Sequence, residues 1–134
     1  MRYVASAQGQ ILAPPAGGPT MHVGDLDPAS SVEPRNRWSA SVTVWVHAAA
    51  DAGEGPLSGI TVNGSWSSGG GGSCTTGADG TCTIDRTNLK GNVASTTFSV
   101  GDLSDTGGSY SYAPGDNHDP DGDSSGTAIT VNQP

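Results

Sequence analysis

Strict alternation over residues 38–48 constrains the fold of this chain more than any other feature. Apolar residues occupy every second position, and small, β-branched or polar residues fill the positions between them. A period of two is the signature of a β-strand with one buried face, and no helical spacing competes with it. We therefore expect the longest strand of the chain here. Its inward face is Trp38, Ala40, Val42, Val44, Val46 and Ala48.

Shorter runs of the same kind are separated by turn-forming residues. They lie at 21–23, 59–66, 82–84, 94–100, 110–112 and 127–131. The glycine run 69–72 is expected to be a flexible loop, and residues 78–80 a hairpin turn. Trp38 and Trp66 share the parity of the core positions, as do Tyr110 and Tyr112. About seven short strands without a helix predict an all-β, antiparallel β-sandwich.

The composition indicates a small core surrounded by many turns. Hydrophobic residues make up 33% of the chain, and there are 21 glycines and 9 prolines. Residues 1–19 have no periodicity and contain several prolines and glycines, so we interpret them as a linker or N-terminal arm preceding a domain over 20–134. No apolar run is long enough for a membrane helix, and no complete signal peptide is present. These features favour a piece of a longer secreted protein.

The charge balance argues against several partners. The formal net charge is −8, from 13 acidic and 5 basic residues, and Lys90 is the single lysine. Phosphate recognition needs clustered basic side chains, so neither nucleic acid nor insertion into an anionic membrane is expected. Acidic residues gathered in loops point to a hard cation, or simply to solubility.

The two cysteines, Cys74 and Cys82, are eight positions apart. They lack the additional nearby Cys or His residues of a zinc site, so a disulfide across a hairpin or a loop between strands is the expected arrangement. A disulfide would indicate an oxidising, extracellular compartment. The alternative is a pair of free, buried thiols.

The acidic loop near the C-terminus carries the sharpest chemical signal. Asp119, Asp121 and Asp123 are spaced by two around Gly122, and Asn117 lies just before them. Carboxylates so spaced in a loop can turn toward one centre, and Ca²⁺ takes six to eight oxygen ligands. The loop is not an EF-hand, because the sixth and twelfth positions counted from Asp119 are serine and threonine.

A second acidic pair, Asp25 and Asp27, follows the first predicted strand. We expect this pair to complete a calcium shell if the end of that strand lies near the acidic loop. The alternative is a solvated acidic turn whose aspartates cap their own backbone.

Catalysis is not expected. His22, His47 and His118 are the only histidines, with His47 on the outward face of its strand and His118 in the acidic loop. Nothing resembles a nucleophile elbow, and a small sandwich seldom provides the cleft that paired carboxylates need. Trp45 faces away from the core and could stack on a sugar or dock a neighbouring domain. Alternatively, residues 1–19 fold back over it.

Residues 21–134 resemble bacterial extracellular domains of the immunoglobulin-like or transthyretin-like type, which are appended to secreted proteases and other exported proteins. The matching motifs are MHVGDLD at 21–27, Trp38 with VTV at 42–44, GPLSGITV at 55–62, SCTT at 73–76 with GTC at 80–82, and NHDPDGDS at 117–124. The resemblance implies an immunoglobulin-like sandwich. It does not select among the spacer, adhesin and stabilising roles of such modules.

Together these observations predict a non-catalytic extracellular structural or interaction module. It would be clamped by one disulfide, stabilised by Ca²⁺, and in contact with neighbouring domains or other extracellular subunits. One alternative is a carbohydrate-binding module that uses Trp45 to hold a polysaccharide. Another is a subunit of an extracellular assembly or filament, in which residues 1–19 add a strand to a neighbour's sheet.

Overall fold

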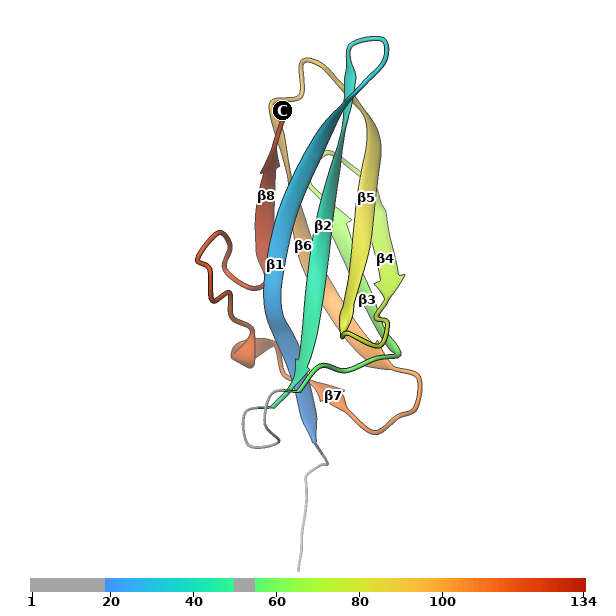
Figure 1. Ribbon diagram of the computed structural model, residues 1–134, viewed down its shortest axis with the longest axis vertical. Helices are drawn as coiled ribbons and strands as arrows, with labels where there is room; N and C mark the ends of the chain where they lie inside the picture. The colour runs from blue at the N-terminus through green and yellow to red at the C-terminus, as the bar shows by residue number, and fades with distance from the viewer. Residues whose placement is uncertain (1–18, 50–54) are drawn as a thin grey trace, which may run out of the picture.

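Two four-stranded sheets packed face to face form the molecule (Figure 1). The structure is a computed structural model that describes residues 19–49 and 55–134. The first sheet has the strand order β5-β2-β1-β7, and the second has the order β4-β3-β6-β8. All pairings are antiparallel except that of β1 with β7, which is parallel. The predicted all-β sandwich is confirmed, and the proposed N-terminal arm lies, apart from Pro19, outside the described residues.

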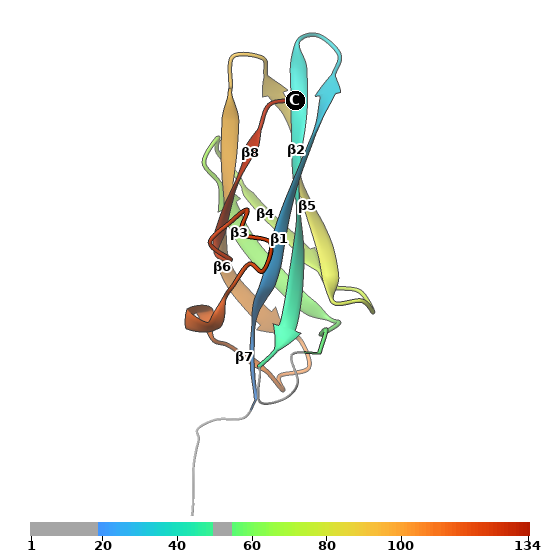
Figure 2. The ribbon, with the colours of Figure 1, turned by 60° about the vertical axis from the view of Figure 1, so that its left-hand side comes forward.

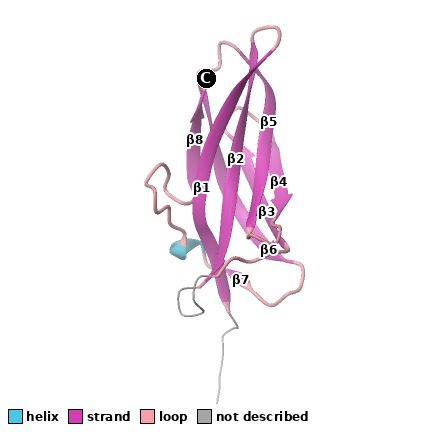
Figure 3. Ribbon diagram, in the orientation of Figure 1, coloured by secondary structure: helices cyan, strands magenta, loops and turns pink. Residues whose placement is uncertain are grey.

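The described residues form eight strands, one more than predicted, and a single 3₁₀ turn. The turn, η2 (Pro114–Asp116), follows β7 (Figure 3). The strands are β1 (Thr20–Glu33), β2 (Arg37–Ala48), β3 (Ile60–Trp66), β4 (Gly71–Thr75), β5 (Thr81–Lys90), β6 (Ser95–Asp105), β7 (Ser111–Tyr112) and β8 (Ala128–Asn132).

The core lies between the sheets and follows the predicted alternation. All six apolar positions of β2 from Trp38 to Ala48 are buried, as are Ile60, Val62 and Trp66 on β3. Phe98 packs against Trp66 with ring centroids 5.0 Å apart. Burying these side chains contributes about 1.5–3 kcal/mol each for the larger aliphatic and aromatic residues. The core positions of Trp38 and Trp66 are therefore confirmed.

The glycine run was wrongly expected to be a loop throughout. Gly71 and Gly72 belong to β4, which pairs with β3 at the edge of the second sheet. A Cβ at position 72 would lie too close to the Ile84 side chain and near the Trp66 indole. Glycine at this position thus lets the edge strand approach the core. A run of glycines suggests a flexible loop from composition alone, and composition does not reveal this close packing.

The disulfide joins the two sheets. Cys74 on β4 and Cys82 on β5 are bonded, with Cα atoms 5.8 Å apart. The two strands belong to different sheets, so the turn at 77–80 is a corner between layers and not the expected hairpin within one sheet. The predicted pairing is confirmed, and it ties together two edge strands that share no ladder.

β1 was expected to end at residue 23, but it runs for 14 residues and is longer than β2. The strand contains a bulge at Gly24. Val23 pairs with Val46 and Asp25 pairs with Trp45, which leaves Gly24 as the extra residue. A bulge moves the following residues by one position in the side-chain alternation. Met21 and Val23 therefore point inward before the bulge, and Leu26 points inward after it.

Candidate metal centre

The loop between β7 and β8 lies along the open edge of β1 (Figure 2). Ala113 donates its amide hydrogen to the Met21 carbonyl at 2.9 Å, and His118 donates to the Val23 carbonyl at 3.1 Å. In return the Val23 amide donates to Oδ1 of Asn117 at 2.8 Å. These bonds continue the short β1–β7 pairing and satisfy backbone groups that an edge strand would otherwise expose.

Asn117 holds the loop in place through both ends of its amide group. Its Nδ2 donates to the Tyr112 hydroxyl at 2.6 Å and to Oγ1 of Thr127 at 3.1 Å. The sequence predicts Asn117 as a cation ligand, and in the structure its Oδ1 accepts a hydrogen bond from the Val23 amide. The three contacts of Asn117 position the loop, and its role as a ligand stays a prediction.

Four carboxylates meet where the loop crosses β1. Asp25 and Asp27 come from the strand, and Asp121 and Asp123 come from the loop. One oxygen atom of each lies within 4.8 Å of the corresponding atoms of the others. The two strand residues lie within β1 and not after it, and the Gly24 bulge places both on the outer face. The structure thus brings together two acidic pairs separated by more than ninety residues.

Asp119 adjoins this cluster and organises the loop. Its carboxylate accepts hydrogen bonds from the Ser124 hydroxyl and, at 3.2 Å, from the Gly122 amide. Burial raises the pKa of Asp119, but hydrogen bonds with Asp121, Ser124 and Asp123 outweigh burial and hold the pKa well below its usual value. Asp119 is therefore the carboxylate of the group that keeps its negative charge most readily.

The neighbouring carboxylates are harder to ionise. Burial, a hydrogen bond with Asp119 and repulsion from other aspartates raise the pKa of Asp25 to about 7. Burial and hydrogen bonds with Asp119 and Asp121 raise the pKa of Asp123 to about 7 as well. A hydrogen bond with Asp119 raises the pKa of Asp121. The causes that raise these pKa values are burial and the neighbouring aspartates, and no lysine or arginine of the described residues contributes.

One oxygen in the cluster has no donor among residues 19–49 and 55–134. Oδ1 of Asp25 is buried and accepts no hydrogen bond from the described part of the chain. A buried carboxylate oxygen without a donor is costly unless a proton or cation compensates it. The oxygen-only donor set matches a hard cation such as Ca²⁺, which binds carboxylates in flexible geometry.

Trp45 lies beside this cluster and is partly buried. Its indole Nε1 donates a hydrogen bond of 3.2 Å to Oδ2 of Asp27. The contact fixes the orientation of Asp27 relative to the other carboxylates.

No protein family, curated protein or solved structure that we compared matches this chain. Among the described residues, no helix is long and apolar enough to cross a membrane.

Sequence reasoning missed the bulge, although a signal for it was present. Core residues occupy odd positions at Met21 and Val23 and an even position at Leu26, with a glycine between them. A change of parity across a glycine is what a bulge produces. The contact of Ser124 with Asp119 and the meeting of the three histidines had no comparable signal, because both depend on the path of the loop.

Proposed function

We propose that this chain is a non-catalytic extracellular structural or interaction module, of the immunoglobulin-like kind, that binds Ca²⁺ where the β7–β8 loop crosses β1. The observation that carries the proposal is the convergence of Asp25 and Asp27 with Asp121 and Asp123. The buried oxygen of Asp25 and the raised pKa values of Asp25 and Asp123 support it, since a divalent cation would replace the protons that the cluster otherwise needs.

The proposed role of the ion is mechanical. An ion bound to the folded state but not to the unfolded chain stabilises the fold in proportion to its affinity and concentration. At this position it would fasten the irregular loop to the edge of β1 and cover that edge. The disulfide at the β4–β5 corner fastens the opposite edge of the sandwich and fits an oxidising compartment.

The interaction role rests on the tip of the β1–β2 hairpin, at the opposite end of the sandwich from the start of β1 at Thr20 (Figure 1). Val32 is 77% exposed there. Arg35, Arg37 and Lys90 line a hollow in the same region. An exposed apolar side chain beside basic groups suits contact with an acidic surface of a neighbouring domain or subunit. A polysaccharide stacked on Trp45 is less favoured, because that side chain is partly buried beside the carboxylates.

The test is thermal unfolding of the oxidised chain in excess Ca²⁺ and in chelator. Ca²⁺ is expected to raise the midpoint of the wild-type chain. Asp123→Asn is expected to abolish most of this rise. In chelator the same variant should unfold at an unchanged or higher midpoint, because it removes repulsion between the clustered carboxylates. Asp85→Asn is the matched control, since Asp85 is an exposed aspartate on β5 outside the cluster.

Two results would count against calcium binding. One is an equal midpoint with and without Ca²⁺. The other is an increase that Asp123→Asn and Asp85→Asn reduce equally, which would indicate general screening of a chain of net charge −8.

A further inference from the structure

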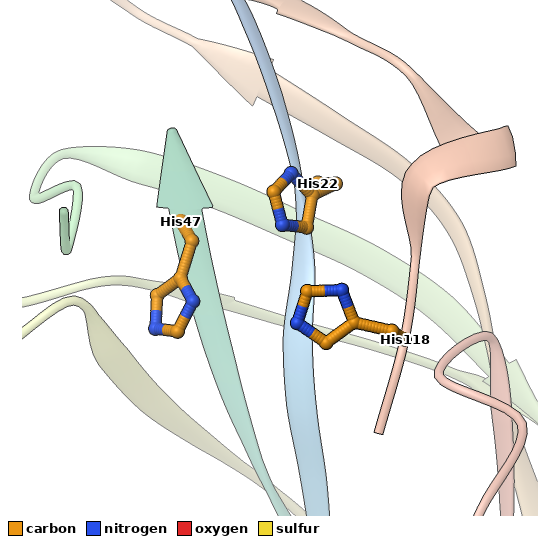
Figure 4. Close-up of side chains that lie close together, drawn as sticks. All are labelled: His22, His47 and His118. Atoms are coloured by element: carbon orange, nitrogen blue, oxygen red, sulfur yellow. The ribbon is translucent and has the colours of Figure 1, made fainter. Parts of the chain in front are cut away.

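A second group of side chains that could hold a metal ion also involves β1 and the β7–β8 loop. His22 of β1, His47 of β2 and His118 of the β7–β8 loop turn their rings toward one another (Figure 4). One ring nitrogen of each lies within 4.8 Å of those of the other two. These are all the histidines of the chain, and they come from three separate segments.

The backbone fixes all three positions. His22 and His47 are directly opposed partners in the β1–β2 ladder, so their side chains share the outer face of the sheet. The amide of His118 is bonded to the carbonyl of Val23, the residue next to His22. A Cβ at Gly126 would collide with the backbone of His118, so the loop is tightly packed at this point.

The ring contacts form a continuous cluster. The centroids of the His22 and His118 rings are 5.0 Å apart, and those of His22 and His47 are 6.2 Å apart in an edge-to-face arrangement. His22 is only 2% exposed, whereas His47 is partly buried and His118 is exposed. The cluster thus has a rigid buried base and an open side from which an ion can enter.

The Gly24 bulge provides the space for the second ring. A Cβ at position 24 would overlap the Nδ1, Cε1 and Cγ atoms of His47. Any other residue would therefore displace the His47 ring from its place beside His22. The bulge places the two aspartates on the outer face and also leaves room for the His47 imidazole there, which is a recurrent use of bulges near binding sites.

We propose that His22, His47 and His118 bind one divalent transition-metal ion of the zinc class, distinct from the proposed calcium. Zn²⁺ binds imidazole nitrogens at about 2.0–2.1 Å, which places tetrahedral ligands roughly 3.4 Å apart. The three ring nitrogens lie within 4.8 Å of one another. Rotation of the two more exposed rings, His47 and His118, would bring the nitrogens to the shorter spacing that a bound ion requires. Three imidazoles leave a fourth position for water, and they select zinc-class ions over Ca²⁺, which prefers oxygen.

The proposal is tested with the full, tag-free chain saturated with Ca²⁺ and titrated with Zn²⁺ by calorimetry. We expect uptake of one Zn²⁺ per chain. The ring-proton NMR signals of all three histidines should shift during the titration, and because the chain has only three, each can be followed. This spectroscopic readout does not depend on any variant folding.

Variants then assign the ligands. His118→Ala removes an exposed ring and should weaken Zn²⁺ binding at least about tenfold, since even the loss of an outer partner of a zinc ligand costs that much. His47→Ala should behave likewise. Asp121→Asn is the matched control in the same loop, and it should leave Zn²⁺ affinity unchanged while impairing the response to Ca²⁺.

Three outcomes would overturn the proposal: no saturable Zn²⁺ uptake by the wild-type chain, uptake unaffected by both histidine variants, or uptake lost in Asp121→Asn. The last would place zinc on the carboxylates. The zinc proposal can be judged even if the chain does not bind Ca²⁺, because the histidine variants keep every aspartate of the carboxylate cluster.

Discussion

The amide of Val23 and the side-chain oxygen of Asn117 are joined by a hydrogen bond of 2.8 Å across 94 residues of sequence. Val23 lies between His22 and Asp25 in the sequence, immediately before the Gly24 bulge, and Asn117 immediately precedes His118. The β7–β8 loop supplies one histidine and two of the four clustered aspartates, so its attachment to β1 determines whether either cluster exists.

Asn117→Ala should destabilise the fold by about 1–3 kcal/mol, because it leaves the Val23 amide without its acceptor. It should also weaken the response to Ca²⁺, since the loop carrying Asp121 and Asp123 loses an anchor. Urea unfolding with and without Ca²⁺ measures both effects. Asn92→Ala, an exposed asparagine in another turn, is the control. Equal effects of the two substitutions would contradict the anchoring role.

In chelator, stability should decrease as the pH rises from about 5 to 8. The pKa values of Asp25 and Asp123 are raised to about 7, above the ordinary 3.8 of an aspartate. The folded state therefore holds protons in this window that the unfolded chain has lost, and their release destabilises the fold. Asp119, with a lowered pKa, has the opposite effect only at more acidic pH.

This pH dependence can be followed by thermal unfolding across the same range. Asp123→Asn should flatten the profile in chelator, and excess Ca²⁺ should flatten or reverse it, because the ion stabilises the ionised carboxylates. A wild-type profile in chelator that rises toward pH 8 would contradict the electrostatic account of the cluster.

Gly24→Ala should destabilise the fold by about 1–3 kcal/mol through collision with the His47 ring. Displacement of that ring should also weaken Zn²⁺ binding. Gly115→Ala is a suitable control, because a Cβ there meets no heavy atom within 4 Å. Calorimetric titration and urea unfolding of both variants test this prediction, and a Gly24→Ala chain as stable as the control would refute the steric argument.

Replacing both Cys74 and Cys82 by serine should cost about 2–3 kcal/mol by the chain-entropy argument for a short closed loop. Because the bond ties β4 to β5 across the sheets, hydrogen exchange should increase first at these two edge strands. Uniform acceleration across both sheets would argue against such a local role. Reduction of the wild-type chain provides an independent comparison.

The all-β class, the inward residues of β2 and β3, and the disulfide pair could all be predicted from the sequence alone. The sequence also singled out the acidic residues that meet in the structure. These features follow from local periodicity and residue chemistry, so they can be predicted without knowledge of the fold. The alternation at Val42, Val44 and Val46 can be satisfied only by a half-buried strand.

The end of β1, the formation of β4 from part of the glycine run, and the side chains that meet in the two clusters depend on the three-dimensional fold. A bulge at one glycine reverses the facing of every later residue in β1, and a loop ninety residues away then supplies the partners of Asp25 and His22. Such meetings depend on chain topology and on a few long-range hydrogen bonds. Neither is encoded in the local spacing from which strands can be predicted.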